Sequence, residues 1–279
     1  MDISKLDQIK FYSISELGEH VEQLEAADGF RRGKASNAGG IDPTFYGPLS
    51  LKKAASLASA GGEWREGADK MPSVHVPHET LDGRPLPVQQ FESDIVGFAP
   101  SVPAYLSGVP DSMLDFVDTD SADKILRVAV HVGRSSTVTP AQIFNRGAAI
   151  LAVLDQLAKE GYAVELWAIW RNNDARTGVS VETRVKASDE LWSPESAAFA
   201  LAHVGFQRRL CWRAAESLQG PNNGGKITNG GYGAGDKANF SDYDLSYKFV
   251  TPQIAGKLNN IDAAVDYIKT ETLAQLAAK

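Results

Sequence analysis

The sequence predicts an α/β protein with a central, mostly parallel sheet and one antiparallel edge strand. Residues 124–133 form a nearly unbroken β-branched apolar run, which is typical of a strand covered on both faces. Residues 141–160 place apolar side chains at helical spacing, and residues 162–170 return as a second buried strand. A strand, a helix and a strand in this order indicate a right-handed parallel crossover.

The residues around the crossover helix have the chemistry of helix ends. Thr139 is suited to the N-cap, and Pro140 is suited to the first helical position. Gly161 follows the last turn and is suited to closing the helix. We therefore expect the helix to begin and end at these residues.

The remainder of the chain continues the α/β pattern. After a short turn, residues 179–185 alternate apolar and polar side chains, which predicts an antiparallel hairpin strand at the exposed edge of the sheet. Residues 193–218 predict one long helix, and residues 244–250 predict a further strand. Asn260 is placed to cap a final helix.

The first 120 residues differ from the rest, and we expect them to form a helical and proline-rich extension packed around an α/β domain of residues 121–279. Residues 72–110 hold seven of the 13 prolines, which favours an extended, irregular path. Strand-like pieces at 88–96 and 113–117 are expected to pair at a sheet edge. Two short amphipathic helices are expected before the proline-rich segment, at residues 14–27 and 51–60.

Composition restricts the class of protein. The net charge of −7 and the pI near 5.3 argue against a dedicated nucleic-acid surface. The single cysteine, Cys211, excludes an intramolecular disulfide and is expected to be a buried thiol. The sequence has no apolar run of about 18 residues and no signal-peptide pattern, so we expect no membrane contact and a soluble protein in a reducing compartment.

Several motifs resemble functional sites but lack the context that such sites need. Residues 220–228 nearly spell a phosphate-binding loop, yet they follow a helix, and a surface loop is the favoured interpretation. Residues 229–235 and 260–262 resemble the glycine signature and second motif of tubulin-like GTPases, at too short a spacing. His75 and His78 have a spacing compatible with zinc, but surface histidines are favoured. We expect no metal, no cofactor and no catalytic residues, and the chain leaves enzymatic activity undecided.

The loop between the first core strand and the crossover helix is the best candidate for a ligand site. It lies at the carboxyl end of the strand, where open α/β sheets place ligands, and it precedes a helix N-terminus, which suits an anionic group. The alternative is an N-cap followed by a solvated turn. Its candidate ligand-binding residues are Arg134, Ser135, Ser136, Thr137 and Thr139.

A second set of residues is a candidate for contact with a partner. Three arginines are expected on one helix, and a tyrosine is expected in a glycine- and asparagine-rich loop that favours exposure. An arginine cluster on a helix is usually solvated or salt-bridged, so nucleic-acid contact is not favoured there. These residues are Arg208, Arg209, Arg213 and Tyr232.

The order of elements from residue 124 onward resembles a von Willebrand factor A-type domain. That family binds a divalent metal through an Asp-x-Ser-x-Ser motif after its first strand. The matching positions here are His131, Gly133 and Ser135, so the resemblance implies the fold without the metal site. Thr251-Pro252 also stands where the family often has Thr-Asp-Gly.

A broader set of motifs is similar to uncharacterised proteins that are common in tailed-bacteriophage genomes. Three of these motifs lie near the N-terminus, and two lie on the expected long helices. They are residues 45–50, 54–58, 62–67, 146–149 and 203–209. The resemblance implies a phage origin and no particular activity.

We therefore expect a non-catalytic phage-encoded protein that binds other macromolecules, as an assembly component or an adaptor. A protein partner or self-assembly is expected, in the cytoplasm of the infected host cell, with a virion-associated location as the alternative. The competing hypothesis is an enzyme or binding protein that acts on a phosphorylated small molecule or nucleic acid at residues 134–139.

Overall fold

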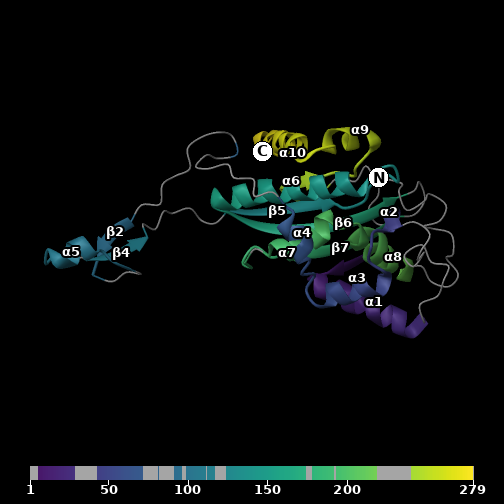
Figure 1. The fold of residues 1–279 in the computed structure, drawn as a ribbon, viewed down its shortest axis with the longest axis horizontal. Coiled ribbons are helices and arrows are strands. Elements are labelled where there is room, and N and C mark those ends of the chain that lie inside the picture. The colour runs from purple at the N-terminus through teal and green to yellow at the C-terminus, as the bar shows by residue number, and fades with distance from the viewer. Residues whose placement is uncertain are drawn as a thin grey trace.

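A computed structural model describes residues 6–28, 43–71, 81, 91–95, 99–110, 112–116, 124–173, 178–191, 193–218 and 240–278. The protein is mixed α/β and is built on a five-stranded sheet in the order β1-β7-β6-β5-β8 (Figure 1). Neighbouring strands are parallel except for the antiparallel pair β6 and β7. The strands are β1 (Leu6–Phe11), β5 (Lys124–His131), β6 (Tyr162–Asn173), β7 (Gly178–Lys186) and β8 (Leu245–Tyr247).

The predicted crossover is confirmed as β5, α6 (Pro140–Lys159) and β6. Thr139 caps α6, because its side chain accepts from the Gln142 N–H at 3.3 Å while the Gln142 side chain accepts from the Thr139 N–H at 2.9 Å. Gly161 follows the helix with a φ of 88°, a conformation that other residues rarely adopt. Val128 and Ala129 point to opposite faces of β5 and are both fully buried, so the strand is covered on both faces, as predicted.

The predicted position of the antiparallel strand at the edge of the sheet is wrong. β7 is antiparallel to β6, but its other side pairs in parallel with β1, from Leu6 opposite Gly178 to Phe11 opposite Thr183. The N-terminal strand is short and carries polar residues at three of its six positions, so its apolar pattern is weak. The first 120 residues therefore contribute a strand to the main sheet.

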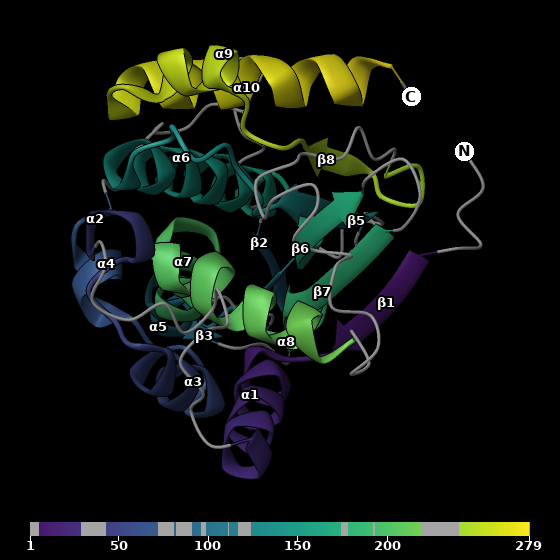
Figure 2. The same cartoon turned by 90° about the vertical axis from the view of Figure 1, so that its right-hand side faces the viewer.

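The N-terminal helices also belong to the main core. α1 (Ile14–Asp28) and α3 (Leu51–Ser59) cross so closely that a Cβ at Gly18 would lie 2.2 Å from the backbone nitrogen of Ser59. Leu17 is fully buried in the same core as the sheet. Two shorter helices, α2 (Pro43–Tyr46) and α4 (Arg65–Asp69), lie on the same side of the sheet (Figure 2).

The helix predicted over residues 193–218 is broken in the structure. It consists of α7 (Pro194–Ala202), the π-helix η3 (Phe206–Cys211) and α8 (Trp212–Ser217). The break occurs at His203, whose backbone is extended with a ψ of 126° and whose ring Nδ1 accepts a hydrogen bond from Gly205 N–H at 2.9 Å. A side chain that bonds to the backbone two residues on competes with the helical ladder, which interrupts the predicted helix.

The C-terminal part covers one edge of the sheet. After β8, the chain forms α9 (Pro252–Ala255), the 3₁₀ turn η4 (Gly256–Leu258) and α10 (Ile261–Ala277), which Asn260 caps as predicted. α10 packs on α6 and beside β8 (Figure 2). Among the described residues, no helix is both long and apolar enough to cross a membrane.

A second, small sheet lies apart from the main sheet, at the left of Figure 1. We call its described residues, 91–95, 99–110 and 112–116, the lobe. The predicted strand-like pieces do pair with each other, but in this separate sheet of order β2-β4-β3. The elements of the lobe are β2 (Phe91–Asp94), β3 (Ala99–Pro100), α5 (Val102–Leu106) and β4 (Met113–Phe116).

Candidate functional site

The loop after β5 lies at the topological switch point of the sheet. The crossover through α6 leads from β5 to β6 on one side, and β8 pairs with β5 on the other side. Ligands of open α/β sheets bind at such points, at the carboxyl ends of the strands. Here the backbones on either side also pair, because Ser135 N–H donates to the Val250 carbonyl at 3.0 Å.

Arg134 is the one buried residue among the five predicted to bind a ligand, with 4% of its surface exposed. Its Nε donates to Gln207 Oε1 at 2.5 Å, while its Nη2 and the Gln207 Nε2 are buried without a hydrogen-bond partner. Burial, with the charges of Arg208 and Arg146 nearby, holds the pKa of Arg134 well below its ordinary value. Two buried donors therefore remain for an acceptor at this end of the sheet.

The hydroxyl groups of the loop do not join Arg134. Ser135 Oγ and Thr137 Oγ1 bond to each other at 3.1 Å, and Thr139 is used in the cap of α6. Ser136 is exposed and has no role in the described contacts. The N-terminus of α6 is thus satisfied by its own capping residues, as the alternative of a cap and a solvated turn requires.

The three arginines that were expected to meet a partner lie inside the protein. The guanidinium carbon of Arg208 lies 3.6 Å from the centroid of the Phe45 ring, and the same side chain donates a hydrogen bond to the Phe45 carbonyl. The guanidinium carbon of Arg209 lies 4.6 Å from the centroid of the Tyr46 ring. Arg213 donates to the buried carboxylate of Glu25. Of the expected solvated or salt-bridged cluster, Arg213 forms a salt bridge, but none of the three arginines is solvated. Aromatic rings and a carboxylate on the N-terminal helices offset the cost of burying them.

The positions that match the A-type metal motif keep one oxygen ligand for a hard cation, the hydroxyl of Ser135. His131 is fully buried, and its Nδ1 accepts from Gly133 N–H at 2.9 Å. Burial lowers the pKa of His131 to about 3, so its ring is neutral at pH 7. Across the part of the chain that the structure describes, no group of three or more His, Cys, Asp or Glu side chains is arranged to hold a metal ion.

Other predicted candidates are either buried or outside the described residues. Cys211 is a buried free thiol, as expected, and burial raises its pKa. Burial also lowers the pKa of His203 to about 4. His75, His78, Tyr232 and the loop of residues 220–236 lie outside the described residues.

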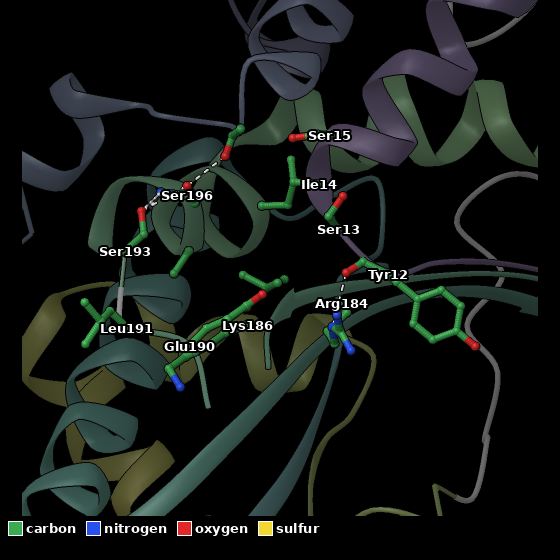
Figure 3. A pocket seen from close by; sticks show the side chains of 13 residues that line it. Tyr12, Ser13, Ile14, Ser15, Arg184, Lys186, Glu190, Leu191, Ser193 and Ser196 are labelled. Atoms are coloured by element: carbon green, nitrogen blue, oxygen red, sulfur yellow. Dashed lines mark hydrogen bonds between the residues drawn. The ribbon is translucent and has the colours of Figure 1, made fainter. Parts of the chain in front are cut away.

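A pocket of about 330 Å³ opens between the first turn of α1, the end of β7 and the start of α7 (Figure 3). Arg184 Nε donates to the Tyr12 carbonyl at 3.1 Å, and Lys186 Nζ donates to backbone carbonyls at 2.8 and 3.1 Å. Glu190 also lines the pocket, beside Leu191, whose surface is 96% exposed. The pocket therefore combines two basic groups, one acidic group and apolar groups.

The exposed apolar residues form a pattern that the sequence interpretation missed. Eight large apolar side chains of the described residues are exposed, and five of them lie on the lobe. Two of the other three line the pocket, and the third lies on β5. Scattered apolar residues need no explanation, whereas these five share one small element of the fold. The five are Ile95, Val102, Tyr105, Leu106 and Val109.

The sequence contains a signal for the same element. Residues 85–123 hold seven Asp or Glu residues and no Lys, Arg or His. The other residues hold the remaining 28 acidic and all 28 basic side chains, so the whole formal charge of −7 comes from this segment. Counting charges along the chain would have marked the lobe and its flanks as a distinct unit.

Comparisons with known proteins identify a family for this chain but no function. A family model described as a domain of unknown function, DUF7192, matches residues 4–273. No curated protein and no solved structure matches the chain.

Proposed function

We propose that this chain, which belongs to the DUF7192 family of domains of unknown function, is a non-catalytic protein that associates with other proteins through its lobe. The observation that carries the proposal is the gathering of exposed apolar side chains on α5 and beside it. Val102, Tyr105 and Leu106 have exposed fractions of 58, 70 and 78%, although side chains of this kind favour burial.

The spacing of these residues suits a contact surface. Positions 102, 105 and 106 are related by three and four residues, so they lie on one side of the short helix α5. An apolar helix face of this kind is a common way to enter a groove on a partner. Tyrosine is also enriched among the residues that dominate binding, because its ring is large and its rotamers are few.

The mass of the protein in solution tests the proposal. The intact protein should associate as its concentration rises, and a variant with Tyr105→Ser and Leu106→Ser should stay monomeric when measured by light scattering. Ile125→Ser is the matched control, because Ile125 is 57% exposed but lies on β5 and away from the lobe. Equal association of the lobe variant and the intact protein would refute the role of the lobe.

A small anionic ligand at Arg134 is the second candidate function. The supporting observation is the pair of buried donors, Arg134 Nη2 and Gln207 Nε2, that have no partner at the end of the sheet. Buried polar groups normally have a hydrogen-bond partner, and an anion or an ordered water would supply that partner here. Millimolar phosphate should raise the melting temperature of the intact protein and not of Arg134→Met if this candidate is correct.

The proposal also covers the fold family, the origin and the location of the protein. The order of elements supports a similarity to A-type domains without their metal site, and the short motifs support a phage origin. A phage origin would place the protein in the cytoplasm of an infected cell or on the virion, as an assembly component or an adaptor. Mass spectrometry of purified virions and of infected-cell extracts would separate these two locations.

A further inference from the structure

We propose that the partner of the lobe is a second copy of this chain, and that the lobe of one copy binds the pocket formed by α1, β7 and α7 of the next. This inference rests on the proposed role of the lobe and names its receptor. It makes the contact head-to-tail, because the lobe and the pocket are different surfaces. Repetition of such a contact gives a closed ring or an open filament.

The charges of the two surfaces are complementary. The lobe and its flanks, residues 85–123, carry a formal charge of −7, while the remainder of the chain is neutral. Two of the three charged residues that line the pocket, Arg184 and Lys186, are basic. Both direct hydrogen bonds to carbonyl groups, and the carboxylates of Glu190 and Asp189 lie near Lys186. Glu190 is the one acidic residue of the lining, so basic side chains outnumber acidic ones around the pocket, which favours an acidic partner.

The apolar groups are complementary as well. Outside the lobe, the described residues expose three large apolar side chains, and Tyr12 and Leu191 of these line the pocket. They are 55% and 96% exposed. The volume of about 330 Å³ is within the range of pockets that enclose a few side chains or a small ligand. A Tyr105 or Leu106 side chain that enters the pocket would therefore remove apolar surface from water on both partners.

The exposure of both surfaces in the single chain favours a contact between copies. Leu106 remains 78% exposed and Leu191 remains 96% exposed, so the lobe does not fill the pocket of its own chain. Figure 1 shows the lobe well away from α7 and the rest of the main body. Each chain thus presents a lobe that can bind another copy and a pocket that its own lobe leaves unfilled.

Mixing two defective variants provides the test. One variant has the lobe disabled by Tyr105→Ser and Leu106→Ser, and the other has the pocket disabled by Leu191→Asp, which places a negative charge against an acidic lobe. All three side chains are exposed, so both variants should fold. Each variant alone should associate at least about tenfold more weakly than the intact protein, as expected when residues that dominate an interface are lost. Ile125→Ser should associate like the intact protein.

The mass of the species in an equimolar mixture of the two variants decides between the outcomes. One intact lobe and one intact pocket remain between the two variants, so the mixture should form a dimer of twice the 30.0 kDa chain mass and no larger species. If the pocket variant associates like the intact protein while the lobe variant does not, the lobe binds elsewhere. The receptor inference then fails, and the proposed function stands. An intact protein that is monomeric at all concentrations overturns the inference that the partner is a second copy, and leaves the lobe as a contact for a different protein.

Discussion

Replacing Glu25 by Gln should show that the N-terminal segment is part of the core of the α/β domain. Glu25 lies on α1 and accepts a hydrogen bond from Arg213 of α8, 188 positions later in the chain. The two side chains are 4% and 1% exposed. Removal of one charge from a buried ion pair typically costs about 3–5 kcal/mol, because the desolvated partner loses its compensation while the volume is unchanged.

The size of the effect can be converted into a melting temperature. A specific unfolding entropy of about 2.1 cal/mol/K per residue over 279 residues turns a loss of about 3–5 kcal/mol into a fall of about 5–9 °C. Urea unfolding monitored by circular dichroism measures the free energy directly. Glu19→Gln is the control, because Glu19 is exposed on the same helix and should leave the stability nearly unchanged.

A result below about 1 kcal/mol for Glu25→Gln would refute the reasoning. It would mean that α1 does not pack on α8 as a fixed part of the core, and that residues 1–120 are a separable extension. The same packing argues that a chain starting at Asp120 should not fold. Such a chain would lack β1, which pairs with β7, and the buried side chains of α1 and α3.

Three further changes test the interior of the protein. Gly147→Ala should destabilise by about 1–3 kcal/mol in urea unfolding, because its Cβ would lie 2.6 Å from the Cβ of Ala202; unchanged stability would contradict the close crossing of α6 and α7. The free energy of unfolding should fall as the pH drops from about 6.5 towards 3, because His131 takes up a proton in the unfolded state but not in the folded state, where its pKa is about 3. A variant with His131→Asn should lose up to about 1.4 kcal/mol per pH unit of this dependence. An identical pH profile of the variant and the intact protein would count against a buried neutral ring. Cys211 should react with a thiol reagent at pH 8 only after denaturation, and rapid labelling of the native protein would contradict its burial.

The sequence predicted those parts of the fold that depend on local pattern. The crossover from β5 through α6 to β6 has a continuous apolar run, helical spacing and cap residues within about 50 positions, and the structure confirms each of them. The pairing of β1 with β7 depends instead on contacts between residues about 170 positions apart. No local pattern fixes such a pairing, so the sequence predicts an extension in the first 120 residues and does not predict the strand at Leu6–Phe11.

Only part of the candidate site could be predicted, again because a sequence pattern is local and does not show contacts between distant residues. The sequence identified Arg134 at the end of a strand and Arg208 on a helix, but it could not show that both are buried close to Gln207. A buried arginine has the same local sequence pattern as a solvated one. The lobe is different, because the acidic bias of residues 85–123 can be read from the sequence alone.

Amide hydrogen exchange of α5 at low and high protein concentration tests the central claim most directly. In the monomer, the short and exposed helix from Val102 to Leu106 should exchange quickly, while α3, whose apolar side is buried, should exchange slowly. If the lobe is the contact surface, exchange in α5 slows as the protein is concentrated and exchange in α3 stays the same. Equal exchange of α5 at both concentrations would contradict the account.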